Sequence, residues 1–257
     1  MATKKTKTLA AVTTVTSVTT SQYIPLTDGS GNVTKVSLAS LKSALLAGID
    51  LNEINDGVFI MYHRASDNFP LMVKPHKWTS IQSGGEIAEG VVIVEGGKIL
   101  VVAPTEADSA GLYWSSAAVS GGGTTTSDRL TAMADWNGKA STAAQVAHTE
   151  CSAETYAPGF CNAYSRVNAN GQGLTAGRWW LPSLGELMMM YANMRKINYA
   201  LSLITGATQL AETWYWSSTE YGANFAWYLY FYDGSAYYGP TKAAYKLRVR
   251  PVSAFLY

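Results

Sequence analysis

The chain has 257 residues, of which 47% are hydrophobic and 14% charged, and its 19 basic and 18 acidic residues leave a formal net charge of +1. This balance argues against a nucleic-acid-binding surface or a polybasic membrane anchor, because phosphate binding depends on clustered Lys and Arg. No apolar run reaches the roughly 20 residues that a membrane helix needs, so we expect no membrane insertion.

The first 56 residues differ in composition and sequence pattern from the rest. Residues 1–22 are rich in Thr and lack the apolar stretch and cleavage site of an export signal, so we expect either a flexible arm or one ordered by a partner chain. Residues 23–56 predict two short strands around a turn at 28–31, then a helix that begins at Ser37 and ends at Gly48. This unit is too small for its own core, which favours an attachment or oligomerisation segment.

From Gly57 onward the pattern changes to short β-branched runs separated by Gly, Asn and Ser, which predict strands. Helical spacing of apolar residues predicts three helices further along the chain, and residues 117–127 predict a flexible loop. The expected strands are 58–62, 70–74, 91–95 and 98–104, with a hairpin turn at 95–98. The expected helices are 128–136, 142–149 and 184–197.

The C-terminal end predicts three further strands, at 214–219, 225–234 and 246–252. Strands followed by helices and then by strands indicate an α+β domain over residues 57–257 rather than a parallel α/β domain.

Thirteen aromatic residues lie between Trp214 and Tyr245. Strand alternation over 227–232 places Trp227, Leu229 and Phe231 on a core face, with Tyr228, Tyr230 and Tyr232 on the other. The tyrosine face is either covered by another element or subunit, or it is an exposed binding surface. Tyr beside Ser, Gly and Asn is typical of binding surfaces, which favours the second interpretation.

The sequence contains no recognisable catalytic or metal-binding motif. His63, His76 and His148 are far apart in the sequence, and the Gly run at 121–123 lacks the Lys of a phosphate loop. Cys151 and Cys161 either pair or are two small buried thiols. We therefore expect neither an enzyme nor a cofactor.

Motifs of the C-terminal part carry a family resemblance. They are the run from Gly177 to Glu186 (GRWWLPSLGE), the run from Tyr215 to Glu220 (YWSSTE), Ala226-Trp227, Asp233-Gly234 and the closing RVRPV from Arg248. Over residues 57–257 the chain resembles the variable proteins of diversity-generating retroelements, which have a C-type-lectin-like fold with a mainly antiparallel sheet and two main helices. Residues 23–49 resemble a short domain of bacteriophage tail proteins.

In that family adenine-directed mutagenesis rewrites chosen codons of the last segment, here about 214–252, while scaffold residues stay fixed. Adenine changes in Asn codons can produce Tyr, Ala, Asn, Phe or Leu but not Trp or Lys, so Trp214, Lys242 and Lys246 are excluded from the variable set. The resemblance implies a variable, ligand-binding set of Tyr221, Ala223, Asn224, Phe225, Tyr228, Tyr230, Tyr232, Tyr237, Tyr238, Tyr245 and Leu247. It implies a scaffold set of Trp216, Ser217, Ser218, Trp227, Arg248 and Arg250.

The implied function is a receptor-binding protein at a phage or prophage tail tip, made in the bacterial cytoplasm and carried on the virion. Its partners would be a protein or glycan on a target cell, other tail proteins and two further copies in a homotrimer. One alternative is a ligand-binding protein displayed on a bacterial surface. Another is a formylglycine-generating enzyme, although no Cys follows Cys161 to supply its reactive pair; the calcium motifs of sugar-binding lectins are also absent.

Overall fold

The structure is a computed structural model that describes residues 23–27, 33–37, 56–239 and 241–255. The chain divides into two units, Met1–Ile49 and Asp50–Tyr257. In the first unit, β1 (Tyr23–Thr27) pairs antiparallel with β2 (Val33–Ser37). The predicted arm, the turn at 28–31 and the helix after Ser37 lie outside the described residues, and the domain boundaries after residues 22 and 56 stay predictions.

The second unit contains a five-stranded antiparallel sheet in the order β12-β6-β5-β3-β4. Its central strand β5 is buried on both faces, which explains its continuous β-branched sequence. Gly96 and Gly97 both have positive φ in the β5–β6 turn, as a two-residue hairpin requires. The strands are β3 (Gly57–His63), β4 (Pro70–Val73), β5 (Gly90–Glu95), β6 (Lys98–Val102) and β12 (Val252–Ser253). The four strands predicted before residue 105 are confirmed.

A smaller antiparallel sheet has the order β11-β10-β9, and a two-stranded ribbon joins β7 to β8. The predicted strand at 225–234 is shorter, because the chain turns after Tyr230, where the Gly234 amide donates to the Tyr230 carbonyl. The bounds are β9 (Trp214–Glu220), β10 (Ala226–Tyr230), β11 (Ser235–Tyr237), β7 (Arg166–Val167) and β8 (Gly173–Leu174).

The predicted strand at 246–252 is wrong except at its end, where Val252 begins β12. Residues 247–248 form only isolated bridges, with Leu112 and Tyr215. The backbone of this segment bonds to three separate parts of the chain, at 103–112, 180 and 214–216, so no continuous ladder with one partner strand forms.

The predicted helix at 184–197 is divided into α7 (Leu184–Ala192) and α8 (Met194–Ser202). Ser183 and Glu186 form a capping box at the start of α7. Asn193 leaves helical geometry at φ −106° and ψ 8°, and its side-chain amide donates to the Met189 carbonyl and to Glu95 Oε2. The backbone of Asn193 thus divides the two helices and its side-chain bonds hold it in place, although the apolar spacing continues through the break.

Two other predicted helices are found with shifted ends, as α3 (Arg129–Met133) and α4 (Gly138–Gln145). Three helices were not predicted: α2 (Pro75–Ser83), α5 (Thr149–Ser152) and α6 (Ala157–Ala163). Pro75 and Pro158 lie in the first turns of α2 and α6, where Pro is a helix-start signal. None of the helices in the described ranges is long and apolar enough to cross a membrane.

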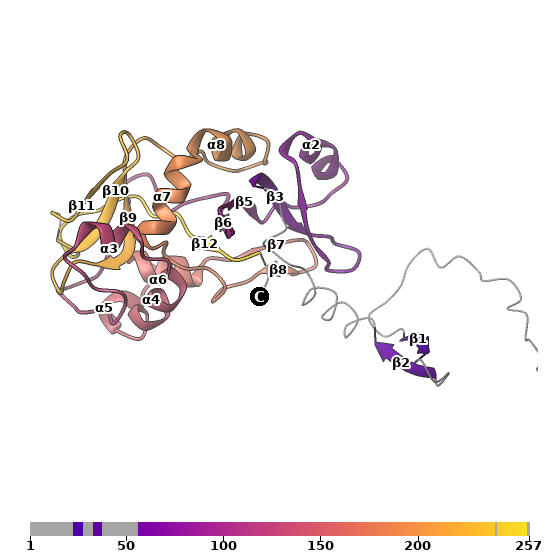
Figure 1. The fold of residues 1–257 in the computed structure, drawn as a ribbon, viewed down its shortest axis with the longest axis horizontal. Coiled ribbons are helices and arrows are strands. Elements are labelled where there is room, and N and C mark those ends of the chain that lie inside the picture. Colours follow the sequence, from indigo (N-terminus) through magenta and orange to yellow (C-terminus); the bar gives the residue numbers. More distant parts are fainter. Residues whose placement is uncertain (1–22, 28–32, 38–55, 240, 256–257) are drawn as a thin grey trace, which may run out of the picture. The chain divides into compact units, whose positions relative to one another are not determined.

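Helices α7 and α8 connect the two larger sheets (Figure 1), since α7 contacts β9 and β10 while α8 contacts β3 and β5. One apolar cluster therefore includes Ile60 and Ile93 from the large sheet, Leu187 from α7 and Leu229 from the small sheet. The small sheet, which carries the predicted aromatic surface, thus rests on the main core of this unit. The α+β class with antiparallel sheets is confirmed.

Candidate ligand-binding surface

Cross-strand pairs place aromatic side chains on one face of the β9–β10–β11 sheet. Tyr230 lies opposite Trp214, and Tyr228 lies between Trp216 on β9 and Tyr237 on β11. Residues directly opposite each other in antiparallel strands project from the same face, so these five rings belong to one side of the sheet.

Four of the aromatic residues at this side are accessible to solvent, and we call them the aromatic patch: Trp214, Tyr230, Tyr232 and Tyr237. Trp214, Tyr232 and Tyr237 are 40%, 67% and 45% exposed, and Tyr230 is half-buried. Ring centroids are 5.6 Å apart between Trp214 and Tyr230 and 5.7 Å apart between Tyr230 and Tyr232. The rings contact each other, and the exposed parts of these side chains face solvent.

Two residues of the predicted variable set are not at the surface. Tyr228 is 6% exposed and Leu247 is 7% exposed, both within an apolar cluster with Trp114 and Trp216. The Tyr228 ring contacts Trp214, Trp216 and Tyr237. The tyrosine face is therefore covered at Tyr228 and opens toward Tyr230 and Tyr232, so the expected exposure of Tyr228 and Leu247 is wrong.

A second aromatic group lies against the other face of the sheet. Tyr221 and Tyr238 stack with centroids 3.9 Å apart and planes 8° apart, and both rings contact Trp227. Tyr238 is 41% exposed, while Tyr221 and Phe225 are half-buried. A hydrogen bond to the Tyr238 hydroxyl raises the pKa of Tyr221. This group forms a further accessible aromatic edge.

The loop between β9 and β10 is held by backbone atoms. The Val119 amide donates to the Ala223 carbonyl, and the Lys242 amide donates to the Asn224 carbonyl, both at 3.0 Å. The side chains of Ala223 and Asn224 are exposed, as is Tyr245 at 54%. A change of side chain at positions 223 and 224 therefore removes none of these bonds.

The predicted scaffold residues lie beneath this surface, and all of them except half-buried Arg248 are buried. Trp216 Nε1 donates to the Leu112 carbonyl, Ser217 Oγ to the Trp227 carbonyl and Trp227 Nε1 to the Thr126 carbonyl. The two Trp side chains thus join the sheet to neighbouring loops, and Ser217 joins β9 to β10.

The Lcl C-terminal domain family model matches residues 103–253, which include the β9–β10–β11 sheet and its scaffold. The chain belongs to the Lcl C-terminal domain family. No curated protein and no solved structure gives a significant match.

Within the Lcl C-terminal domain, the sequence missed Glu106 as a scaffold residue. Its carboxylate, 5% exposed, accepts Arg248 Nη1 at 2.6 Å, lies 3.1 Å from Arg250 Nη2 and accepts the Tyr215 hydroxyl at 2.9 Å. A lone Glu before a Gly-containing turn carries no sequence signal for this role. Trp214 was excluded from the variable set, yet it lies in the aromatic patch; its pairing with Tyr230 could have been predicted from the strand register.

The two cysteines of the Lcl C-terminal domain are free and buried, which confirms the thiol interpretation. Burial raises the pKa of Cys151 to about 12 and that of Cys161 well above its usual range. Neither is therefore a reactive thiolate at neutral pH.

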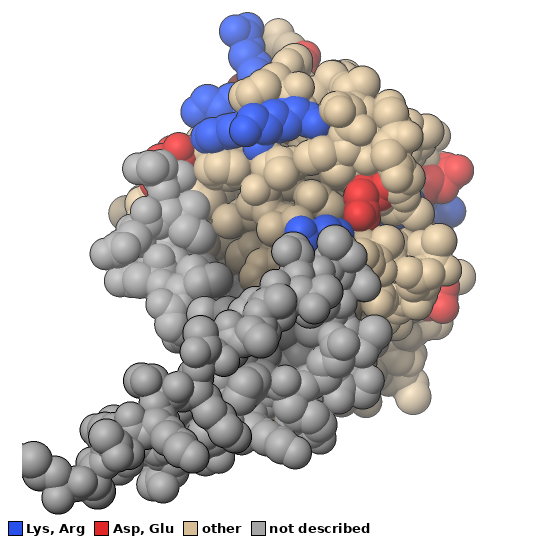
Figure 2. Space-filling view, turned by 90° about the vertical axis from the view of Figure 1, so that its right-hand side faces the viewer, with Lys and Arg blue, Asp and Glu red and all other residues tan. Residues whose placement is uncertain are grey.

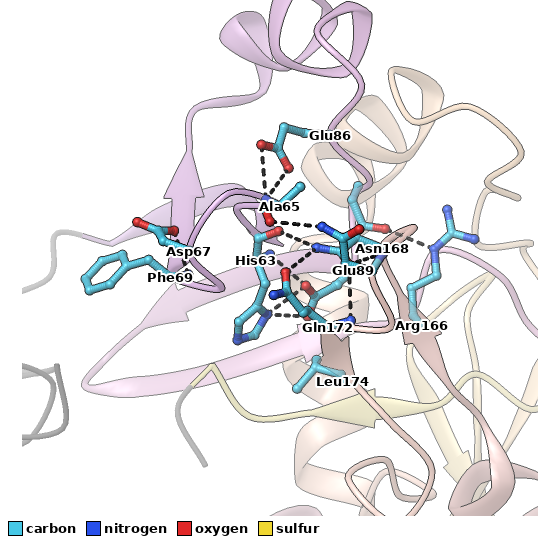
Figure 3. Close-up of polar contacts among 12 residues, drawn as sticks. His63, Ala65, Asp67, Phe69, Glu86, Glu89, Arg166, Asn168, Gln172 and Leu174 are labelled. Carbon is cyan, nitrogen blue, oxygen red and sulfur yellow. Dashed lines mark hydrogen bonds and ion pairs between the residues drawn. The ribbon is translucent and has the colours of Figure 1, made fainter. Parts of the chain in front are cut away.

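A polar cluster surrounds Glu89, which precedes the residues matched by the Lcl family model (Figure 3). His63 Nδ1 lies 2.7 and 2.9 Å from the two Glu89 oxygens, and the His63 amide donates to the same carboxylate at 2.6 Å. Asn168 Nδ2 donates to the His63 carbonyl and so ties the β7–β8 turn to β3. The described residues include no group of three side chains suited to a metal ion. We interpret this cluster as a structural junction between β3 and the β7–β8 ribbon.

Basic side chains gather at a different place from the aromatic patch. Figure 2 shows them at the top of one face, the level at which α2 and α8 lie. Lys77, Arg195 and Lys196 are the exposed cations of these helices, together with Lys74 before α2. The aromatic patch is instead built on the three-stranded sheet, so its chemistry is dominated by tyrosine hydroxyls and ring faces.

Proposed function

We propose that the protein is a non-enzymatic ligand-binding protein of the retroelement-diversified class with a C-type-lectin-like fold. The observation that carries the proposal is the aromatic patch, in which Trp214, Tyr232 and Tyr237 remain exposed above a buried, hydrogen-bonded frame. Trp and Tyr provide large contact area at low entropic cost and dominate the energetics of many interfaces. Membership of the Lcl C-terminal domain family agrees with this proposal.

Tolerance to sequence change supports the diversification part of the proposal. At Ala223 and Asn224 the side chains point to solvent while backbone carbonyls make the loop's bonds. Surface substitutions of this kind usually change stability by less than about 0.5 kcal/mol. The test is a DNA repeat near the gene that matches the region encoding residues 214–252 except at adenines; a unique region without such a repeat would contradict diversification.

In this proposal the ligand is a protein or glycan on a bacterial cell, and the carrier is a phage or prophage tail tip. The first unit would attach the chain to other tail proteins or join three copies, and several copies on one particle would raise avidity. Display on a bacterial surface is the second candidate. Tail genes beside this gene favour the virion, and secretion genes favour the cell surface.

Binding itself is tested with the full chain on a panel of bacterial strains. Tyr232→Ala and Tyr237→Ala together should abolish retention on the strains that bind the unchanged protein. Tyr199→Ala is the matched control, because Tyr199 is 55% exposed on α8, outside the patch. Full retention by the Tyr232/Tyr237 double variant would show that the aromatic patch is not the binding surface.

A further inference from the structure

An ion pair is fully buried behind the predicted ligand surface. Lys242 and Glu220 side chains are both 0% exposed, and Lys242 Nζ lies 2.5 Å from Glu220 Oε2. Lys242 Nζ also donates to the Val119 carbonyl at 2.8 Å and lies 4.1 Å from the centroid of the Trp114 ring. These contacts of the ammonium group are all with the protein interior.

The Glu220 carboxylate also accepts hydrogen bonds from the glycine run at 121–123, which the sequence predicted to be flexible. Its Oε2 accepts the Gly121 amide at 2.9 Å and its Oε1 accepts the Gly123 amide at 3.2 Å. A Cβ at Gly121 would lie 2.7 Å from Gln145 Cγ, and one at Gly123 would lie 2.8 Å from Gln145 Nε2. The run at 121–123 is thus fitted against α4 and anchored by one carboxylate, which corrects the prediction of a flexible loop.

The backbone of the same two residues joins the surface segments. Lys242 donates its amide to the Asn224 carbonyl, and its carbonyl accepts the amides of Trp114 and Ser115. Glu220 ends β9 immediately before Tyr221 and bonds through its backbone to Thr124 and Thr126. Segments 113–126, 221–225 and 241–245 consequently meet at this one pair.

We propose that Lys242 and Glu220 are positioning residues of the ligand surface, which fix the conformation of the 221–225 loop and the 241–245 segment independently of their side chains. This inference rests on the proposed function, because it explains how exposed positions can change while the surface keeps its shape. Neither residue contacts a ligand in this proposal.

The cost of the arrangement supports a positioning role. Burying two charges loses hydration that their attraction repays only with good geometry, and apolar pairs of similar size are often at least as stable. Burial lowers the pKa of Lys242 against the opposing effect of Glu220. The geometry is directional: one ammonium and one carboxylate together hold Val119, Gly121 and Gly123 through backbone atoms. An apolar pair could fill the same volume but could hold none of these atoms.

The test uses the full chain with the double substitution Glu220→Gln/Lys242→Met, which we call the Gln/Met frame; the chain with native Glu220 and Lys242 is the unchanged frame. Ala223→Asp or Asn224→Tyr is then introduced into each frame. Backbone hydrogen exchange is followed at the Val119 and Lys242 amides, with β5 as an internal reference. In the unchanged frame, substitutions at 223 and 224 should leave exchange at Val119 and Lys242 unaltered. In the Gln/Met frame, exchange there should be roughly tenfold faster and should depend on the residue at 223 or 224.

A core variant separates positioning from stability. Ile197→Ala on α8 lowers the unfolding temperature at a buried site away from the pair, and should leave exchange at Val119 and Lys242 insensitive to positions 223 and 224. If the Gln/Met chain does not fold, Glu220→Asp keeps both charges but shortens the reach of the carboxylate, and it should still accelerate exchange at Gly121 and Gly123. Unchanged exchange in the Gln/Met or Asp frame, or equal sensitivity in the Ile197→Ala frame, would overturn the inference. No ligand enters this test, so its failure leaves the binding experiments on Tyr232 and Tyr237 unaffected.

Discussion

Trp214 and Tyr230 lie opposite each other on β9 and β10, with ring planes 76° apart and centroids separated by 5.6 Å. Trp214 remains 40% exposed in this arrangement. Under the proposed diversification, the pair places a residue that Asn-codon mutagenesis cannot produce beside a tyrosine that it can. A constant indole beside replaceable rings would serve as a common anchor for different ligands.

Trp214→Ala should weaken binding to target cells by about 2 kcal/mol or more, since exposed Trp residues in aromatic clusters are frequent hot spots. Trp214→Phe retains a ring against Tyr230 and should recover part of the affinity. Binding isotherms on cells measure both effects, with unfolding temperatures as the control for folding. Equal affinity of the Ala variant and the unchanged chain would show that Trp214 is not an anchor.

Trp227→Ala should lower the free energy of unfolding by about 3–5 kcal/mol, the usual range for a buried large aromatic residue. Trp227 is 1% exposed and its indole nitrogen holds the Thr126 carbonyl. Asn224→Ala at the exposed loop should cost less than about 0.5 kcal/mol. Urea denaturation measures the loss of unfolding free energy in the two variants and so distinguishes a scaffold residue from a surface residue. Similar losses for both variants would contradict this distinction.

Glu106→Gln should destabilise the domain by about 3–5 kcal/mol, because it removes the countercharge of fully buried Arg250. Arg248→Met should cost less, since Glu106 keeps Arg250 as its partner and the lost Arg248 side chain is 24% exposed. Chemical denaturation of the two variants gives the comparison. If Arg248→Met proved the more harmful change, the pair of Glu106 with Arg248 would contribute more to stability than its pair with buried Arg250.

Stability should fall as pH rises from about 4.5 to about 7, because burial raises the pKa of Glu186 to about 7. The folded state favours the protonated carboxyl, so this contribution is complete below the unfolded-state pKa near 4.3 and is lost as pH rises through the folded value. Its size is on the order of 3 kcal/mol. Denaturation at several pH values should show this slope in the unchanged chain and a flatter one in Glu186→Gln. Parallel profiles would assign the pH dependence to other groups.

Strand alternation correctly predicted which residues of the segment 227–231 lie on the core face. Trp227, Leu229 and Phe231 are buried together as expected. Alternation along one strand could not indicate that Trp214, Trp216 and Tyr237 cover Tyr228, since those side chains come from the neighbouring strands. Exposure along the tyrosine face therefore differs from residue to residue and depends on the tertiary structure.

Long-range polar contacts were beyond prediction for the same reason. Glu220 bonds to Gly121 and Lys242, which lie 99 and 22 residues away in sequence, and nothing near Gly121 indicates a carboxylate partner. The break at Asn193 was missed because apolar periodicity continues across it, whereas the backbone leaves helical geometry at Asn193 and its side chain bonds to Met189 and Glu95. The α+β class depended on regular local patterns and was predicted correctly.

Oxidative footprinting of the full chain on target cells tests the binding surface most directly. Bound protein should show reduced labelling of Tyr232 and Tyr237, while Tyr199, which is 55% exposed, should be labelled as in the free protein. Protection of Tyr199 with unchanged labelling of Tyr232 and Tyr237 would place the ligand elsewhere and contradict the proposed function.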